Sequence, residues 1–417
     1  MIDLSDPDAY VDGPPHELFA ELRVTDPVHW QDMRGEPGYW AVLRHADLVH
    51  VAREPTLFSA ERGGVVIEDL DPERLAMMRN MLLSMDPPRH LDYRRPLVPS
   101  FKAKIIGGLE GRIRTICKEI MAGAAEQRDV EFVHDVTASL PSQVIGELVG
   151  LPRDDWAKIH RWAEMNTSGQ DRDFQDADLH PEPASGDAGD VSGDSYAASG
   201  GDGTVHMAMY AIELAARRRL EPPREDLTSL ILGTEFGGEF MSDIDFASFF
   251  VQMVTAGNDT TKTMLSSGLL ALLGHPDQLA ELRADPSLMP GAVEEILRWA
   301  NPLHYFRRTA SADTVLNGTR IAEGDKVAMM YTSANRDEEV FANPNGFDIH
   351  RHPNPHVSFG IGEHFCLGVH LARLEARVFF EELLATFATI ELRDEPKRTR
   401  SNLNNALKSL PVTLVAA

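Results

Sequence analysis

Apolar residues recur at helical spacing along most of this chain. Between residues 242 and 273 the pattern is almost uninterrupted, from the N-cap candidate Ser242 to the His275-Pro276 pair beyond its end. At 1.5 Å per residue this helix would be about 45 Å long, enough to cross a domain of this size. The same spacing predicts helices at 45–52, 105–125, 140–149, 154–165, 204–219 and 292–299, and Pro87-Pro88 predicts a further helix start.

Short runs of β-branched and aromatic residues interrupt the helical pattern. They predict strands at 39–43, 314–316, 326–330 and 412–415, whereas 65–67 is expected in a loop. No internal repeat and no domain boundary can be recognised. The pattern therefore predicts a mainly α protein with small β sheets, built as a single domain over residues 1–417 around a long central helix.

The segment from about residue 170 to 204 lacks this patterning. It is rich in Ser, Gly, Asp and Ala, and such a composition cannot bury enough apolar surface to offset the entropy lost on ordering. The simplest interpretation is a solvated, flexible linker. A second hypothesis is a lid between two helices over an active site, because loops of this kind often gate access.

Composition narrows the class of protein. Hydrophobic residues make up 43% of the 417 residues and charged residues 25%, as in soluble globular proteins. The formal net charge of −25 argues against a nucleic-acid partner, since phosphate binding requires a basic surface. No run of about 18 apolar residues is present, and the first residues resemble neither a secretory signal nor an anchor, so we expect no membrane span and a cytoplasmic location.

The most informative segment is residues 359–368, which contain Cys366, one of two cysteines. Three glycines and two phenylalanines accompany Cys366 just before a predicted helix start at Leu367. Glycines allow backbone N–H groups to approach the sulfur, and a helix N-terminus lowers the pKa of a thiol. A thiolate held in this way needs a partner. Cys117, in contrast, lies in an amphipathic stretch and is expected in the core.

Residues 359–368 match the pattern Phe-Gly-x-Gly-x-His-x-Cys-x-Gly in full and resemble the haem-binding loop of the cytochrome P450 family. The resemblance implies the fold of that family and haem b as the cofactor, with Cys366 as the proximal ligand of the iron. It also implies that Phe359 and Gly368 contact the haem.

The long helix contains the unusual run Ala256-Gly257-Asn258-Asp259-Thr260-Thr261. Gly257 costs about 1 kcal/mol of helix propensity relative to Ala, and a small-residue gap beside an acid and an alcohol makes room for a ligand. Alternatively, a threonine hydroxyl bonds back to a carbonyl one turn earlier and only bends the helix. The run resembles the oxygen-binding segment of the same family. That resemblance implies that Ala256 borders the haem, Thr260 hydrogen-bonds iron-bound dioxygen and Asp259 relays protons.

Two further sets of residues fit the resemblance. Glu295 and Arg298 form a Glu-x-x-Arg pair which, with Arg351, implies a structural network behind the haem. Haem propionates require cations in a buried site. The positions that resemble propionate ligands are His90, Arg94, Arg308 and His364, with Arg307 as a neighbouring alternative to Arg308.

The expected activity is that of a haem-thiolate monooxygenase, which inserts one oxygen atom of O2 into a hydrophobic substrate. The resemblance is greatest to soluble bacterial members that oxidise steroids, terpenoids or aliphatic chains, and a steroid or isoprenoid is favoured over a fatty acid or alkane. The chain lacks a glycine-rich dinucleotide fingerprint, so electrons from NAD(P)H are expected through a separate ferredoxin and reductase that dock near Cys366. The residues expected in the substrate pocket are Met253, Ala256, Leu303, Tyr305 and Leu403.

Two other functions remain open at this point. A peroxide-driven haem-thiolate enzyme would use H2O2 directly, but such enzymes tend to lack an acid–alcohol pair like Asp259-Thr260. A haem-thiolate binder or sensor without catalysis would explain Cys366 and leave that pair without a role.

Overall fold

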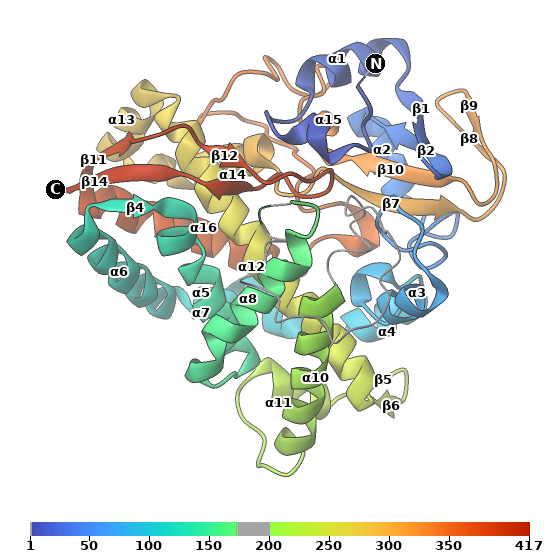
Figure 1. Ribbon diagram of the computed structural model, residues 1–417, viewed down its shortest axis with the longest axis horizontal. Coiled ribbons are helices and arrows are strands. Elements are labelled where there is room, and N and C mark those ends of the chain that lie inside the picture. Colours follow the sequence, from blue (N-terminus) through green and yellow to red (C-terminus); the bar gives the residue numbers. More distant parts are fainter. Residues whose placement is uncertain (1, 172, 174–200) are drawn as a thin grey trace.

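The computed structural model describes residues 2–171, 173 and 201–417 (Figure 1). Most of the segment expected to be a linker or a lid, about 170–204, lies outside the described residues. The expectation of a mainly α fold with small sheets is confirmed, because helices occupy most of the described chain and the strands are short.

The central helix α12 spans Asp243–Leu273, and the Ser242 hydroxyl accepts the Asp245 N–H at its start, as predicted. Most of its side chains are buried on all sides, which is typical of a helix enclosed by others. Several helices pack against it (Figure 1). They are α7 (Ser139–Val149), α8 (Trp156–Thr167), α10 (Gly201–Arg218), α14 (Met289–Ala300) and α16 (Val369–Thr386).

The expected helix at 105–125 is two helices, α5 (Ala103–Gly107) and α6 (Glu110–Gln127). The break follows the Gly107-Gly108 pair, where two residues of low helix propensity adjoin. The remaining helices of the described chain are α1 (His16–Thr25), α2 (His45–Arg53), α3 (Pro72–Met78), α4 (Arg89–Arg94), α11 (Leu227–Leu232), α13 (Pro276–Ala284) and α15 (Tyr331–Ala334).

The largest sheet has five strands in the order β1 (Val28–Met33), β2 (Glu36–Val42), β10 (Lys326–Met330), β7 (Tyr305–Ala310) and β3 (Phe58–Ser59). Only the β2–β10 pair is parallel. A second sheet joins β11 (Phe387–Leu392), β14 (Pro411–Ala416) and β4 (Asp129–Glu131). The two-stranded sheets are β5 (Glu235–Phe236) with β6 (Glu239–Phe240), β8 (Thr314–Leu316) with β9 (Thr319–Ile321), and β12 (Lys397–Arg398) with β13 (Leu407–Ser409).

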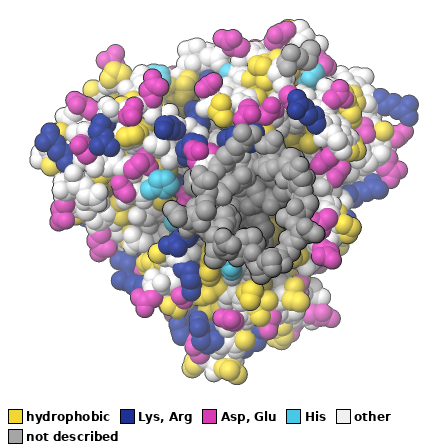
Figure 2. Space-filling model, in the orientation of Figure 1, with side chains coloured by type: hydrophobic (Ala, Val, Ile, Leu, Met, Phe, Trp, Pro, Cys, Tyr) yellow, Lys and Arg dark blue, Asp and Glu magenta, His cyan; other side chains and the backbone are white. Residues whose placement is uncertain are grey.

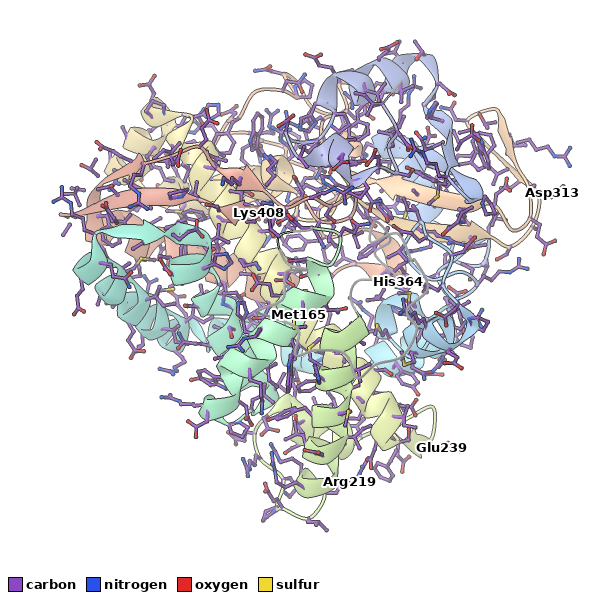
Figure 3. All side chains as sticks on the ribbon, in the orientation of Figure 1. Met165, Arg219, Glu239, Asp313, His364 and Lys408 are labelled. Carbon is purple, nitrogen blue, oxygen red and sulfur yellow. The ribbon has the colours of Figure 1, made fainter. Side chains whose placement is uncertain are left out.

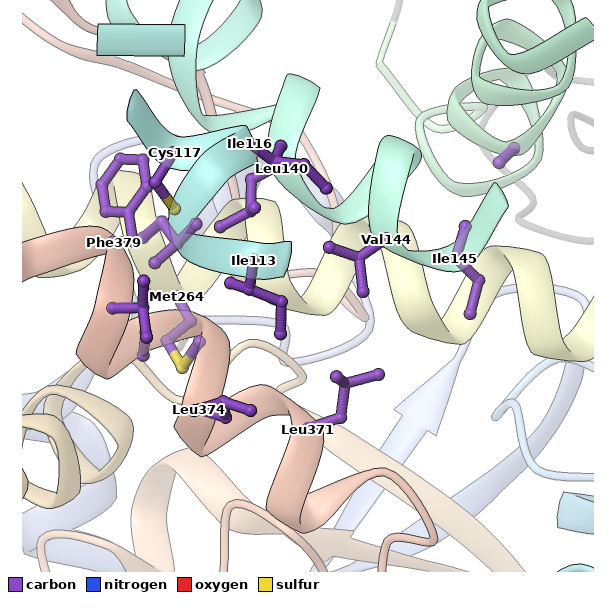
Figure 4. Packing of buried hydrophobic residues seen from close by; sticks show 14 of the residues in the cluster. Ile113, Ile116, Cys117, Leu140, Val144, Ile145, Met264, Leu371, Leu374 and Phe379 are labelled. Carbon is purple, nitrogen blue, oxygen red and sulfur yellow. The ribbon is translucent and has the colours of Figure 1, made fainter. Parts of the chain in front are cut away.

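The helical core brings α6, α7, α12 and α16 together (Figure 4). Cys117 lies fully buried in it beside Phe379, as predicted, and burial raises the pKa of its thiol to about 12. Such a thiol stays protonated and behaves as a small hydrophobe. Of the two cysteines, Cys366 alone faces the cavity described below.

Acidic and basic side chains are interspersed over the face shown in Figure 2. Many of them form ion pairs, for example Arg112 with Glu147 and Arg377 with Glu110. Within the described residues, no helix combines the length and apolar character needed to cross a membrane.

A buried ionic cluster connects α14 to the segment before Cys366. Arg298 Nη2 lies 2.7 Å from Glu295 Oε1, and Arg351 Nε lies 3.0 Å from Glu295 Oε2. The Glu295 and Arg298 side chains have no exposed surface. The Arg298 guanidinium also donates to the carbonyl groups of Asn335, Pro344 and Gly346, so that one side chain joins three loop positions.

Replacing Glu295 by Gln should destabilise the protein by about 3–5 kcal/mol, because two buried guanidinium groups lose their counter-charge. Urea unfolding of the holoprotein measures the effect. Asp313→Asn is the control: the Asp313–Arg320 pair, 2.8 Å apart, lies exposed at the outer edge of the molecule (Figure 3) and is worth about 0–1 kcal/mol. Equal losses in the two variants would contradict a central structural role for Glu295.

Candidate active site

A cavity is bordered by α12 and by the segment that carries Cys366. Its wall is mainly apolar, and its few polar groups come from separate elements. The apolar lining residues include Leu82, Leu83, Phe101, Ile145, Met253, Met264, Leu297, Leu303, Phe306 and Leu371.

The cysteine segment is folded by its glycines. Gly360 and Gly362 adopt φ values of 68° and 71°, in the left-handed region that favours glycine. A Cβ on Gly362 would lie 2.5 Å from the Ala52 carbonyl oxygen, so α2 also requires a glycine there. The Cys366 N–H donates to the Phe359 carbonyl at 2.8 Å and closes the loop. Helix α16 then begins at Val369, two residues after the predicted start at Leu367.

The expected lowering of the Cys366 pKa is wrong for the protein without a cation at the sulfur. Burial raises the pKa of the thiol, and the Gly368 N–H and the Arg94 charge only partly offset that effect. A metal cation bound to the sulfur would reverse the balance, because coordination deprotonates a thiol. The geometry of the loop therefore suits a metal-bound thiolate better than a free one.

Four groups that can carry positive charge gather near Cys366. His90 and Arg94 come from α4, Arg308 from β7, and His364, labelled in Figure 3, from the cysteine segment. The His90 and His364 ring centroids are 4.3 Å apart. Successive side chains of a strand point to opposite faces, which decides between Arg307 and Arg308 as the candidate propionate ligand. Arg308 lines the cavity, whereas Arg307 lies 3.0 Å from Asp69 on the other side.

Among the residues that the structure describes, no anion lies within hydrogen-bond distance of the two histidines of this cluster. His90 Nδ1 and His364 Nε2 are buried without a partner. Burial, followed by the neighbouring positive charges, lowers the pKa of His90 to about 4 and that of His364 to about 2. Buried donors in this state call for a negatively charged partner. The cluster, together with the nearby Cys366 thiol, fits the two propionates and the iron of haem.

On the opposite wall, Ala256 and Thr260 line the cavity. The Thr260 hydroxyl donates to the Ala256 carbonyl at 2.7 Å, which is the alternative contact considered from the sequence. Its oxygen still has lone pairs for a second partner. Gly257 also lines the cavity, and a Cβ there would lie 2.8 Å from the Ile145 side chain on α7, so the glycine permits close helix packing as well.

Asp259 is directed to a second, polar cavity that also borders Thr260. Lys262 Nζ lies 3.0 Å from Asp259 Oδ1 and 2.9 Å from Glu164 Oε1, and the Thr167 hydroxyl donates to Asp259. Burial alone would raise the pKa of Glu164, but the Lys262 ammonium lowers it below its usual value. Asp259 and Glu164 likewise outweigh burial and raise the pKa of Lys262.

The sequence reasoning missed Lys262 and Glu164. Lys262 could have been found, because a lysine three residues after Asp259 in an apolar helix needs a nearby acid. Glu164 could not be assigned, since its contact depends on how α8 crosses α12.

The substrate-pocket residues expected from the sequence divide into two groups. Met253, Ala256 and Leu303 line the cavity, whereas Tyr305 and Leu403 do not. Tyr305 faces the other side of β7, where it packs in a buried cluster with Leu403, and its hydroxyl accepts the Ile67 N–H at 3.3 Å. Phe306, one residue later, takes the cavity-facing position. The prediction that Tyr305 and Leu403 line the substrate pocket is therefore wrong: Tyr305 lies on the opposite face of β7, and Leu403 packs with it in the core.

Glu375 is a buried acid in the cavity wall that the sequence reasoning also missed. It lies on α16, two to three turns after Cys366, and its side chain is 3% exposed. Burial raises the pKa of its carboxyl group to about 8, and a hydrogen bond with Thr261 on α12 only partly opposes this. The folded protein therefore binds a proton at Glu375 that the unfolded chain, with an ordinary carboxyl pKa, releases.

Stability should consequently depend on pH through Glu375. Its contribution is fully present below the ordinary carboxyl pKa of 4.5 and is lost as pH rises through about 8, with a maximum slope of about 1.4 kcal/mol per pH unit. Glu375→Gln cannot ionise, so the variant should gain stability over the parent between pH 5 and about 8. Urea unfolding at several pH values checks the difference. Parallel pH profiles for the two proteins would contradict the raised pKa.

Comparison with known proteins points to the same family as the geometry of the cavity. The family model "Cytochrome P450" matches residues 206–414. The chain is 34% identical over 413 residues to a steroid C26-monooxygenase of Mycolicibacterium smegmatis, covering 97% of this chain and 91% of that protein. It is 35% identical over 420 residues to a linalool 8-monooxygenase of Pseudomonas putida, covering 99% and 98%.

Among solved structures, the chain resembles Mycobacterium marinum cytochrome P450 CYP268A2 in complex with pseudoionone. The TM-score is 0.86 at 36% identity, with 95% of this chain and 94% of that chain covered. The similarity therefore spans the fold and both walls of the cavity.

Proposed function

Because this chain belongs to the cytochrome P450 family, we propose that it is a haem-thiolate monooxygenase that inserts one oxygen atom of O2 into a hydrophobic substrate and reduces the other to water. The observation that carries the proposal is the pairing of two features across one cavity. The Cys366 thiol, with two histidines and two arginines near it, lies in one wall. The Asp259-Thr260 pair lies at the other wall.

Residues of this chain would hold the haem as follows. Cys366 binds the iron, and His90, Arg94, Arg308 and His364 bind the propionates. Phe359, Gly368 and Ala256 border the macrocycle. The bound haem supplies the iron that activates dioxygen. Glu295, Arg298 and Arg351 act structurally by fixing the segment that precedes Cys366.

Thr260 and Asp259 would deliver protons. Thr260 borders both cavities, so its hydroxyl can accept a proton from the polar side and hold one toward the reacting oxygen. Asp259 borders the polar cavity together with Thr260, and its ion pair with Lys262, which also contacts Glu164, holds its side chain there. These contacts give Asp259 access to solvent protons without opening the apolar cavity to water.

The substrate would be a steroid or isoprenoid ahead of a fatty acid or alkane. Two relatives are named for a steroid and for linalool, a third, 36% identical to this chain, is a methyl-branched lipid omega-hydroxylase, and a related structure holds pseudoionone. The mainly apolar wall supports a substrate of that kind.

Electrons would come from NAD(P)H through a separate ferredoxin and its reductase in the cytoplasm. The surface behind Cys366 supports docking there, because His370, Arg373 and Arg377 border a groove between α5 and α16. Arg373 and Arg377 are paired with Glu294 and Glu110, so an acidic partner would compete for these guanidinium groups.

The proposal predicts that the reduced protein binds CO with the Soret band characteristic of thiolate ligation. Cys366→His should abolish that band and replace it with a histidine-type spectrum, because the sulfur ligand is lost. Cys117→Ser is the matched control and should keep the thiolate band, since Cys117 lies in the core away from the cavity. A histidine-type spectrum in the parent protein would overturn the proposal.

The Asp259-Thr260 pair favours oxygenation over the peroxide-driven and non-catalytic alternatives. Thr260→Ala should lower product formed per NAD(P)H several-fold and raise hydrogen peroxide release, because a positioned proton donor contributes about 10²-fold or more to a step. Thr260→Ser retains the hydroxyl and should remain coupled. If Thr260→Ala forms as much product per NAD(P)H as the parent protein, the only role of this hydroxyl is its hydrogen bond to Ala256. If the parent protein turns over as fast with hydrogen peroxide as with electron donors, the peroxide-driven alternative is favoured.

A further inference from the structure

Gln252 is a polar side chain on the cavity side of α12. Gln252, Ala256 and Thr260 are spaced four residues apart, which places them on one face of the helix, and all three line the cavity. At 1.5 Å per residue, Gln252 and Thr260 are separated by about 12 Å along the helix axis. Thr260 marks the end of the cavity where the reaction is proposed to occur, so Gln252 marks a position well removed from it.

The Gln252 amide has no hydrogen-bond partner among the residues that the structure describes. Its Oε1 atom is buried and accepts no hydrogen bond. Buried polar atoms without a hydrogen-bond partner are uncommon in native proteins and require an explanation. Met253, the adjacent lining residue, is apolar, as are Leu82 and Leu83 in the same cavity wall. A ligand in the cavity can supply the missing partner.

The charges of the cavity restrict what that ligand can be. Among the lining residues described, the groups able to carry positive charge are His90, Arg94, Arg308 and His364, all assigned above to the haem propionates. An ionised carboxylate beside Gln252 would therefore be buried without a counter-charge, at a cost of several kcal/mol. A hydroxyl or ketone fits instead, because a primary amide offers both a donor and an acceptor.

We propose that Gln252 determines substrate specificity by hydrogen-bonding one neutral oxygen, a hydroxyl or a ketone, at the end of the substrate remote from the oxidised carbon. The separation from Thr260 selects a molecule on the order of 10 Å long, which is the scale of a steroid alcohol or ketone. Free fatty acids are disfavoured by their charge, and hydrocarbons leave the amide unpaired. This inference rests on the proposed function and deepens it.

The test compares three ligands of one saturated steroid skeleton: one with a ring-A hydroxyl, one with a ring-A ketone, and the hydrocarbon that lacks the oxygen. Calorimetry and the Soret shift report the Kd of each for the holoprotein. The parent protein should bind the alcohol or the ketone about 3- to 10-fold more tightly than the hydrocarbon. Gln252→Leu keeps the side-chain size and should remove that preference while binding the hydrocarbon as well as before.

Gln127→Leu is the matched control, since it makes the same substitution at an exposed residue at the end of α6, outside the cavity; it should keep the preference. The role of Gln252 would be overturned if Gln252→Leu raised the Kd of all three ligands equally. It would also be overturned if the variant still bound the alcohol or the ketone more tightly than the hydrocarbon. A thiolate CO band in the same variant shows that the haem site is intact, so this failure is separate from that of the proposed function. Absence of the thiolate band from the parent protein would count against the proposed function itself.

Discussion

The placement of charge inside an apolar interior is the constraint on which this structure depends. Glu295 neutralises Arg298 and Arg351, and the Arg298 guanidinium holds carbonyl groups of three loop positions. These loops lead into residues 359–368. The position of the Cys366 sulfur relative to α12 therefore follows from a set of buried ionic contacts that take no direct part in chemistry.

Polar groups on the two sides of the cavity differ in whether they have hydrogen-bond or ion-pair partners. Near Cys366, His90 and Arg308 are buried, and ring nitrogens of His90 and His364 have no partner among the described residues, a state that suits a negatively charged cofactor. Along α12, Asp259 is already satisfied by Lys262 and Thr167 and belongs to a separate polar cavity. Thr260 borders both spaces. Asp259 and Thr260 are adjacent on α12, so one turn of this helix lies between the apolar cavity and the smaller polar one.

Much of this arrangement could be predicted from the sequence because its signals are local. Helical spacing predicted α12, and the fixed pattern around Cys366 indicated the cysteine segment. Contacts between distant segments were harder: whether Tyr305 or Phe306 faces the cavity depends on the register of β7 in its sheet, and Glu164 reaches Lys262 only because α8 crosses α12. The Cys366 pKa was predicted in the wrong direction, since burial by remote elements outweighs the local helix and glycine effects.

The unpaired His90 and His364 rings have a consequence for the life of the protein in the cell. A cofactor that supplies the missing negative charge binds the folded chain and not the unfolded one, so its free energy of binding adds to the free energy of folding. Newly made chains would then mature only as fast as haem is supplied. Under haem shortage the apoprotein would be the form that proteases remove, which ties the abundance of the enzyme to cofactor biosynthesis without a dedicated regulator.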